Sequence, residues 1–534
     1  MLHGASTAAA LFALYIRACV GLFGYSGEST PPMYGDFEAQ RHWMEVTVNL
    51  APRAWYVQGP DNDLQYWGLD YPPLSAHLSW VLGHLARLLG HPALVALYSS
   101  RGHESATTRA FMRHTVLACD ALVFLTAAAS FAAAAAPRRD AIARATLLLQ
   151  LALVPALVLV DHGHFQYNCV SLGLTLWAAR FALGGRPLAS SAAFSLALNF
   201  KQMSLYLAPA FFCYLLSGCM RRGESSLMRT AHVAKLGLVV VGTFALCWLP
   251  FLTSPADALA VLTRVFPVER HLYEDKVANL WCTLALLPFL KLKQTLSIAS
   301  LLRLALLTTL GALLPPCVIL LRRPSRLGFV LCATSCGLAF FLCSYQVHEK
   351  HILLPLLPAS LLAHRQPALF GWFATVACFS LYPLLKRDGL SLPYAVLQLA
   401  FLVLSLALSP SRVPPSRASA APSPASALPL PPYAGAVMVA SLCGMLLLHF
   451  LEASLPPPAR YPDLHAVAFA AYSCAHFCLA YVVAVGTQWH VASRAAGRDE
   501  HTPMDAEGRA GKHEDEMQRV FAFADELPSK AKAA

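Results

Sequence analysis

The sequence predicts an all-α integral membrane protein that crosses the bilayer many times. Hydrophobic residues make up 57% of the 534 residues, charged residues only 13%, and the mean hydropathy is +0.52. Average soluble domains carry about 25% charged residues, and a soluble chain of this length needs more polar surface to cover its core. Apolar runs also recur along the chain at the length of about 20 residues that a transmembrane helix needs.

These runs predict about fourteen membrane-spanning helices. The first run has no basic segment before it and further spans follow it, so we expect a retained signal anchor. The predicted spans lie near residues 5–23, 114–136, 145–161, 168–185, 187–200, 203–219, 232–252, 299–321, 327–344, 350–364, 367–385, 389–409, 434–452 and 463–487.

Basic clusters between the spans predict the topology, because cytoplasmic loops carry an excess of Lys and Arg. Three clusters fall on one side when alternate loops are counted, and that side is expected to be cytoplasmic. Lys291 with Lys293, and Lys386 with Arg387, fall on the other side and disagree with this scheme. The three cytoplasmic clusters are Arg138, Arg139 and Arg144; Arg221, Arg222 and Arg229; and Arg322, Arg323 and Arg326.

The first predicted lumenal loop, residues 24–112, is long enough to build a site rather than only connect two helices. Within it, residues 73–98 are apolar but interrupted by His77, His84, Arg87 and His91. This pattern predicts an amphipathic helix in the membrane interface rather than a span.

The chain divides into four predicted parts. Residues 1–409 form the catalytic transmembrane module, and residues 410–433 are a Pro/Ser/Ala-rich cytosolic linker. Residues 434–487 form a C-terminal transmembrane hairpin, and residues 488–534 a polar cytosolic tail. The tail ends with Lys530 and Lys532 in the pattern of a KxKxx retrieval signal, which coat proteins read from the cytosol.

The composition excludes several other classes. The net charge of +11 is scattered in short loop clusters with no basic stripe, so we expect no nucleic-acid binding. Most of the 15 cysteines lie in apolar runs without a CxxC pair, which indicates small buried side chains rather than disulfides or zinc ligands. The chain has no Asn-x-Ser/Thr sequon.

Polar residues beside or inside spans are costly in a membrane and are therefore functional candidates. Asp36 and Glu38 follow the first span at the depth where a lipid-linked sugar phosphate would present its anomeric carbon. A carboxylate there can act as a general base on an acceptor hydroxyl, although a solvated acidic loop with an N-capping Asp also fits. Arg17 and Asp120 lie inside spans, where they could pair with each other or with neighbouring helices.

Further polar clusters follow on the same predicted side. His162 and His164 are one residue apart, but no third ligand accompanies them, so hydrogen bonding is favoured over a metal site. Five cationic side chains could neutralise a departing phosphate, with snorkelling or a local salt bridge as the alternative for each. They are Lys201, Arg270, Lys276, His348 and Lys350.

Together these strings resemble the dolichyl-phosphate-glucose-dependent α-1,3-glucosyltransferase family, part of the GT-C superfamily of multispan glycosyltransferases. The resemblance covers residues 25–355. It rests on YGDFEAQRHWME, LQYWGLDYPPL, HFQYN, NFKQM, VFPVER, EDKVANLWC and SYQVHEK, in this order. The first two strings favour the member that adds the first glucose over its sibling that adds the second.

The resemblance implies a GT-C fold and chemistry in the lumen of the endoplasmic reticulum. The donor would be dolichyl-phosphate glucose, and the acceptor the nine-mannose dolichyl-diphosphate oligosaccharide. It implies no cofactor and no metal, Asp36 as the catalytic base and His348 as a donor-phosphate contact. The candidate substrate-binding residues are Glu38, Arg41, Trp67, Asp70, Tyr71, His164, Gln166, Lys201, Arg270, Lys276, His348 and Lys350.

The implied mechanism is a single in-line displacement that inverts the anomeric carbon, because the donor is β-linked and the product α-linked. Two other functions remain open. The sibling enzyme would use the same base and donor. A lipid-linked sugar transporter has similar hydropathy, but transporters tend to carry internal repeats and midplane sites, and no clear repeat is present.

Overall fold

The computed structural model describes residues 4–136, 140–220, 225–266, 276–286, 296–408 and 434–496. The described residues form helices and connecting loops, and the one β-type pairing among them is an isolated bridge between Gly59 and Asn62. The predicted all-α membrane fold is therefore confirmed. The linker 410–433 and most of the tail, with its lysine motif, lie outside the described residues.

The N-terminal half begins with a helix that leads into an extramembrane segment and then returns to the bundle. Its elements are α1 (Gly4–Val20), α2 (Asp36–Asn49), η1 (Pro52–Ala54), α3 (Pro73–Leu88), η2 (Pro92–Val95), α4 (Ala106–Cys119), η3 (Asp120–Phe124), α5 (Leu125–Ala135), α6 (Ala141–Ala152), α7 (Pro155–Val158), η4 (Leu159–Phe165), α8 (Asn168–Leu183), α9 (Pro187–Phe200), η5 (Gln202–Leu207) and α10 (Ala208–Cys219).

The C-terminal half is a series of helices joined by short connections or by stretches outside the described ranges. Its elements are α11 (Ser226–Trp248), η6 (Leu249–Phe251), α12 (Pro255–Val265), α13 (Leu280–Leu284), α15 (Ile298–Arg322), α16 (Arg326–Cys343), η7 (Glu349–Ile352), α17 (Leu353–Ser360), α18 (Pro367–Ser380), α19 (Tyr382–Arg387), α20 (Ser391–Ala407), α21 (Ala434–Ser454) and α22 (Leu464–Ala496).

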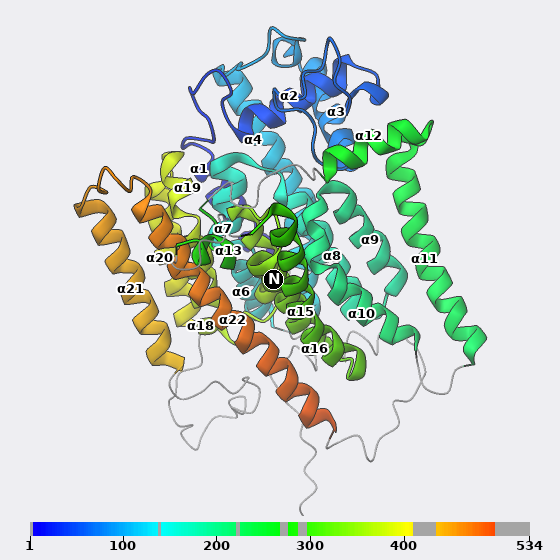
Figure 1. Ribbon diagram of the computed structural model, residues 1–534, viewed down its shortest axis with the longest axis vertical. Coiled ribbons are helices and arrows are strands. Elements are labelled where there is room, and N and C mark those ends of the chain that lie inside the picture. The colour runs from blue at the N-terminus through cyan, green and yellow to red at the C-terminus, as the bar shows by residue number, and fades with distance from the viewer. Residues whose placement is uncertain are drawn as a thin grey trace, which may run out of the picture.

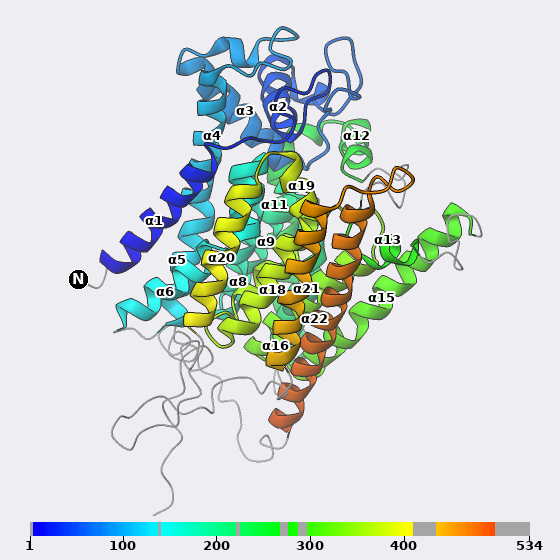
Figure 2. The ribbon, with the colours of Figure 1, turned by 90° about the vertical axis from the view of Figure 1, so that its left-hand side faces the viewer.

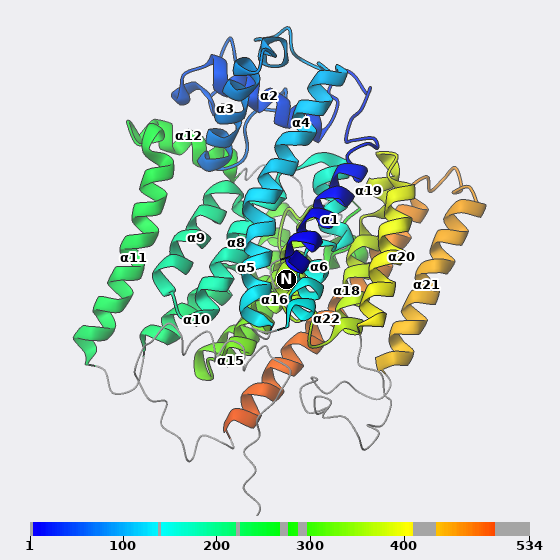
Figure 3. The same ribbon diagram turned by 180° about the vertical axis from the view of Figure 1, so that it is seen from behind.

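The helices form a bundle with a cap at one end. Figure 1 shows α2, α3 and the start of α4 above the bundle, with α12 beside them. Most of the predicted loop 24–112 therefore forms this cap, and its last residues continue into the bundle as α4. In Figure 3, which shows the opposite side of the molecule, α1 lies in front of the bundle and rises obliquely toward the cap.

Each predicted span coincides with a helix or a pair of helices, but their lengths differ. Seven helices of the described chain are long and apolar enough to cross a membrane, or up to eight if the bent pair Ala141–Ala152 and Pro155–Phe165 is one span. Four further apolar helices are shorter, namely α1, α8, α18 and α20. A helix of 16 residues spans only about 24 Å, less than the hydrocarbon core of about 30 Å. The number of fourteen stays a prediction.

The expected amphipathic segment 73–98 forms α3 and the short helix η2, and it is not among the candidate spans. Trp80, Val81 and Leu88 are exposed on α3, whereas Ser75 and Ser79 are buried. An amphipathic helix with exposed Trp and Leu is typical of a membrane interface. Its interfacial position stays a prediction.

The ends of the bundle agree with the predicted sidedness of the basic clusters. The end of α5, the start of α6, the end of α10, the start of α11 and the short α15–α16 connection all lie at the end opposite the cap (Figure 3). Lys386 lies on the cap side, against the charge rule, and its ammonium forms an ion pair with Glu452 of α21. That partner compensates one of the charges that disagreed with the topology.

The hairpin of α21 and α22 packs against the rest of the bundle (Figure 2). Trp372 Nε1 donates to Ser441 Oγ at 3.0 Å, Tyr481 donates to the Ala312 carbonyl at 2.6 Å, and Gln488 donates to the Pro316 carbonyl at 2.9 Å. Two helices of the main bundle, α15 and α18, are therefore held to the hairpin. Its assignment as a separate part stays a prediction.

The two charges predicted inside spans pair with each other. Arg17 Nε lies 2.7 Å from Asp120 Oδ2, and His162 Nε2 lies 2.8 Å from the same oxygen. All three side chains are buried. An isolated charge inside a membrane is expensive, so this pairing holds α1, η3 and η4 together near the site described next.

A candidate active site beneath the cap

The site begins where α2 starts. Asp36 is the first residue of α2, and its backbone N–H donates to Ser26 Oγ at 3.1 Å. Gly35 lies so close to Ser26 that an added Cβ would stand 2.5 Å from the Ser26 backbone carbon. Only a glycine permits this approach, which fixes the first turn of α2. A carboxylate at a helix N-terminus is also stabilised by the helix dipole.

A second element brings two side chains to Asp36. The segment η4 is π-helical and contains His164, and Gln166 follows it directly. Between them Phe165 has a φ of +86°, a left-handed conformation that is costly for a bulky residue and clusters at functional sites. The Phe165 ring is buried and packs edge-on against Phe37 at 4.8 Å. This packing holds the turn that aims both neighbours at α2.

One oxygen of Asp36 receives three donors. His164 Nε2 lies 2.7 Å from Asp36 Oδ2, Gln166 Nε2 lies 2.5 Å from it, and the ammonium group of Lys350, from η7, contacts the same atom. No donor from the described residues contacts Asp36 Oδ1. The Asp36 side chain is 19% exposed, and among the described residues its hydrogen bonds are all made through Oδ2.

The surrounding charges keep Asp36 ionised. Burial by itself raises the pKa of Asp36, but the charges of Lys350 and His164 outweigh burial and hold this pKa well below its usual range. Burial opposes the charge of Lys350, and Asp36 in turn raises the pKa of Lys350 above its usual value. At neutral pH the pair is therefore a carboxylate and an ammonium ion.

Lys201 lies next to this cluster without an acidic partner. Its ammonium donates to Asn168 Oδ1 at 2.6 Å and to Gln166 Oε1 at 3.4 Å, and it stands 4.6 Å from the centre of the Tyr71 ring. No carboxylate of the described chain lies within ion-pair distance of it. Burial, followed by the positive charge of Lys350, lowers the pKa of Lys201 to about 8. A buried cation with only neutral partners is suited to an anionic ligand.

A narrow cavity of about 10 Å³, enough for about one water molecule, lies beside Lys201, between α2, α3 and the end of α9. One part of its wall is polar, with Gln40, Tyr71, Ser79 and Lys201. The other part is apolar, with Leu78, Leu82 and Phe200. Gln40 is one helical turn after Asp36, so the cavity adjoins the carboxylate. Its wall therefore combines polar and apolar side chains.

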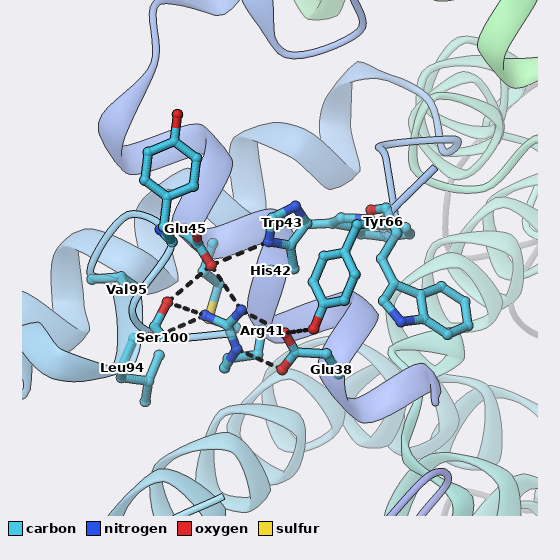
Figure 4. A network of polar contacts seen from close by, with 12 residues as sticks. Glu38, Arg41, His42, Trp43, Glu45, Tyr66, Leu94, Val95 and Ser100 are labelled. Atoms are coloured by element: carbon cyan, nitrogen blue, oxygen red, sulfur yellow. Dashed lines mark hydrogen bonds and ion pairs between the residues drawn. The ribbon is translucent and has the colours of Figure 1, made fainter. Parts of the chain in front are cut away.

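Two predicted binding residues, Glu38 and Arg41, take part in a buried network inside the cap (Figure 4). The Arg41 guanidinium contacts Glu38 with two nitrogens at 2.7 Å each and Glu45 at 2.8 Å. Tyr66 donates to Glu38 at 2.8 Å, and Ser100 donates to Glu45 at 2.9 Å. These contacts join α2 to two distant loops. We propose that this network is structural, since its charged groups already have partners.

The other predicted residues are distributed unevenly. Tyr71 and Lys201 line the cavity, and the Asp70 carbonyl accepts from Gln202 at 3.1 Å. Trp67 donates to the Met33 carbonyl within the cap. His348 is the N-cap residue just before η7, and its ring packs edge-on against His351 at 5.3 Å. Substrate contact by Asp70, Trp67 and His348 stays a prediction.

Lys276 illustrates the salt-bridge alternative. Its ammonium lies 2.8 Å from Asp463, in the connection between α21 and α22, and the two side chains are 48% and 56% exposed. A solvent-exposed pair of this kind contributes little. Arg270 lies outside the described residues.

Three cysteine sulfurs form the one group in the described chain with the proximity that metal ligation requires. Cys317 of α15 and Cys332 of α16 each lie 3.8 Å from Cys336, and all three sulfurs lie within 4.8 Å of one another. They are inside the bundle, whereas the Asp36 cluster lies beneath the cap. This thiol group is therefore separate from the candidate active site.

Sequence reasoning did not single out Asp388, Asn168 or Gln40. Asp388 contacts His164 Nδ1 at 2.5 Å, and Asn168 contacts Lys201. Asp388 follows Lys386 and Arg387, whose disagreement with the charge rule marked this connection as unusual. An acidic residue between two spans on the predicted lumenal side was the available signal.

The sequence of the chain also matches that of a known protein family. A sequence model of the ALG6, ALG8 glycosyltransferase family matches residues 13–483. The chain belongs to this family. The match includes every element that contributes to the Asp36 cluster and also most of the C-terminal hairpin. The chain is therefore a membrane glycosyltransferase by family, and the resemblance noted in the sequence is confirmed.

Individual members of the ALG6, ALG8 family are similar over most of their length. Gallus gallus dolichyl pyrophosphate Man9GlcNAc2 alpha-1,3-glucosyltransferase is 43% identical over 480 residues, covering 88% of this chain and 94% of its own. The probable enzyme of the same name from Arabidopsis thaliana is 41% identical over 494 residues, covering 92% and 90%. The probable Schizosaccharomyces pombe enzyme is 39% identical over 489 residues, covering 90% and 91%.

Proposed function

We propose that this protein transfers glucose from dolichyl-phosphate glucose, in α-1,3 linkage, to the terminal mannose of the nine-mannose dolichyl-diphosphate oligosaccharide. The names of the relatives support this acceptor and linkage. The donor is proposed from the resemblance and from the site, which combines a carboxylate with two lysines.

One observation carries the mechanism: among the described residues, the three donors to Asp36 all use Oδ2 and none uses Oδ1. The 3-hydroxyl of the terminal mannose would donate its hydrogen to Oδ1 and attack the anomeric carbon of glucose. Asp36 then receives the proton as the bond to the donor phosphate breaks. A positioned general base typically contributes about 10²- to 10⁴-fold to the rate.

The charges of the site match the charge that moves in this reaction. The donor phosphodiester carries one negative charge, and the departing dolichyl phosphate gains another as Asp36 becomes neutral. Lys350 contacts Asp36 and Lys201 lies one hydrogen-bonded side chain away. Both ammonium groups would stabilise the departing phosphate, as charged donors do at developing anions.

Movement of Lys350 would also make Asp36 a better base. A carboxylate with a pKa far below its usual range accepts a proton weakly. When the donor phosphate draws the Lys350 ammonium away, Asp36 loses the cation that contributes most to holding its pKa low. The base would then become stronger when donor is bound.

The stereochemistry follows from the use of one carboxylate. A single displacement by the mannose hydroxyl turns a β-linked donor into an α-linked product. Retention would need a second carboxylate placed as a nucleophile. Asp388, whose carboxylate contacts the opposite nitrogen of the His164 ring, has a side chain that is only 3% exposed. The arrangement therefore supports inversion.

We further propose that the protein is in the endoplasmic reticulum membrane with its cap and site in the lumen and its C-terminus in the cytosol. Arg229 in the first turn of α11, Arg322 at the end of α15 and Arg326 at the start of α16 support this orientation, because these helix ends lie opposite the cap (Figure 3). Coat-protein recognition of Lys530 and Lys532 is part of the same proposal. Its test is relocation of the protein after both are replaced by serine.

The function is tested by incubating the purified protein with dolichyl-phosphate glucose and either the nine-mannose acceptor or its singly glucosylated product. We expect transfer to the first acceptor only. Transfer to the second alone would identify the activity as that of the sibling enzyme. Movement of lipid-linked sugar across liposomes without transfer would instead indicate a transporter.

A further inference from the structure

Asp388 is a buried carboxylate at the site that comes from a part of the chain far from the other site residues. It follows α19, is 7% exposed, and precedes Gly389, which has a φ of +73°. The left-handed turn at Gly389 reverses the chain so that the segment 388–390 lies against η4. Glycine adopts this conformation without strain.

Two glycines allow this segment to approach so closely. A Cβ at Gly24 would stand 2.6 Å from the Asp388 carbonyl oxygen, and a Cβ at Gly163 would stand 2.7 Å from Leu390 Cδ1. Arg113 stabilises the backbone of η4 at this contact, since its guanidinium donates to the carbonyls of His162 and Gly163 at 2.5 and 2.9 Å. The position of Asp388 is thus determined by several independent contacts.

The His164 ring lies between two carboxylates. Its Nδ1 is 2.5 Å from Asp388 Oδ2, and its Nε2 is 2.7 Å from Asp36 Oδ2. When both carboxylates are ionised, each can only accept a hydrogen bond; both ring nitrogens then donate, and the ring is an imidazolium ion. Lys350 Nζ lies 3.2 Å from the same Nε2. Two cations and two anions therefore balance within the cluster.

We propose that Asp388 is a positioning residue that keeps His164 doubly protonated and aimed at Asp36 Oδ2 throughout the transfer. This inference rests on the proposed function. His164 is the cation of the cluster that cannot follow the departing phosphate, because its ring is 2% exposed and bonded on both sides. When Lys350 moves, His164 still binds Oδ2 and keeps Oδ1 directed at the acceptor.

The pH dependence of the His164 ring is set by the charged groups around it. Asp36, Asp388 and Lys350 contact the ring directly. Arg113 and Glu349 are the next charged groups, and they act on Asp388 and Lys350 respectively. Asp388→Asn removes one charge from this set with little change of volume, while Asp36, Lys350, Arg113 and Glu349 remain.

The test measures glucose transfer by the purified full-length protein from pH 5.5 to 9.5. For Asp388→Asn we expect kcat at pH 7 to fall by at least about tenfold and by up to about 10⁴-fold, the loss seen when the orienting carboxylate of a catalytic histidine is replaced. The alkaline limb of the kcat profile should move down by about one to three pH units, because an opposite charge in contact shifts a titration by that amount. KM for the donor should change less than about threefold.

Asp140→Asn is the matched control. Asp140 caps α6 at the end of the bundle opposite the cap, where its carboxylate accepts from the Ala143 N–H at 2.8 Å. Asn caps a helix as well as Asp does, so this variant should keep the wild-type rate and profile. Asp388→Glu retains the charge and should keep the alkaline limb in place even if its rate falls.

The outcomes separate the inference from the function. If the wild type transfers glucose and the pH profile of Asp388→Asn is unchanged, the inference is wrong but the proposed function stands. The same holds if Asp388→Asn loses the same fraction of its rate at every pH. If Asp388→Asn does not fold, a shifted alkaline limb in Asp388→Glu overturns it. Absence of transfer by the folded wild type overturns the proposed function and this inference with it.

Discussion

The His164 imidazole lies 2.7 Å from the Asp36 carboxylate although 128 residues separate the two in the sequence. The contact joins the cap to the bundle, since Asp36 starts α2 and His164 is in η4. The proposed catalytic carboxylate, on a helix of the cap, is thus oriented by a buried residue of the bundle. Positioning of this kind limits how far the base can drift from its working geometry.

Lys350→Gln should lower kcat about a hundredfold, because one charge that stabilises the departing phosphate is removed. It should also change the pH profile. Lys350 helps to hold the pKa of Asp36 low, so without it Asp36 is protonated at higher pH. The acid limb of kcat/KM for the donor, which reports the free enzyme in which Lys350 contacts Asp36, should therefore move to higher pH, as measured by glucose transfer between pH 4.5 and 8.

Lys235→Gln, an exposed lysine in the middle of α11, is the control for this substitution. It removes the same charge far from η7 and should leave the rate and the profile unchanged. An acid limb that stays in place in Lys350→Gln would show that Lys350 does not act on Asp36.

Donor affinity should depend on the protonation of Lys201. The pKa of Lys201 is lowered to about 8, so its ammonium loses its proton as the pH rises through that value. The KM for dolichyl-phosphate glucose should then rise between pH 7 and 9, while KM for the acceptor stays constant. Lys201→Arg should remove this rise, because a guanidinium remains charged. An equal rise in the arginine variant would contradict the role of Lys201.

Arg41→Met should destabilise the protein by about 3–5 kcal/mol, because it leaves Glu38 and Glu45 buried without their cation. Arg109→Met is the matched control, since Arg109 and its partner Glu28 are 46% and 35% exposed. Such a surface pair is worth about 0–1 kcal/mol. Thermal unfolding of the two purified variants measures these losses of stability. Equal losses would show that the buried network does not contribute more stability than a surface ion pair.

The same network gives a pH dependence of stability. Burial by itself raises the pKa of Glu45, but His42 and Arg41 outweigh burial and hold it at about 2. A folded pKa below the unfolded value gives stability that is present above the ordinary carboxyl pKa and lost as the pH falls toward 2. The unfolding temperature should drop between pH 4.5 and 2, and this drop should be smaller in Glu45→Gln.

Much of the helix arrangement was predictable from the sequence, because an apolar run inside a membrane can satisfy its backbone hydrogen bonds by forming a helix. The π-helical turn at η4 was not predictable. Its sequence passes from the end of an apolar run into a polar cluster, which does not specify a π-helix. The left-handed conformation of Phe165, between His164 and Gln166, depends on its packing against Phe37.

The site was predictable in part for a similar reason. Asp36, His164, Gln166, Lys201 and Lys350 were expected on one side of the membrane, and the structure brings them together. Sequence reasoning could not tell that Arg41 turns toward Glu38 and Glu45, because both substrate binding and internal pairing use the same residue types. Asp388 was missed because its partner is 224 residues away.

The most direct test of the proposed mechanism compares wild type with Asp36→Asn in transfer from dolichyl-phosphate glucose to the nine-mannose acceptor, at matched unfolding temperature. Asn keeps the shape of the side chain but cannot take the proton. We predict transfer by wild type and a fall in kcat of about 10²- to 10⁴-fold in the variant. A folded Asp36→Asn protein that transfers glucose at the wild-type rate would contradict the assignment of Asp36 as the base.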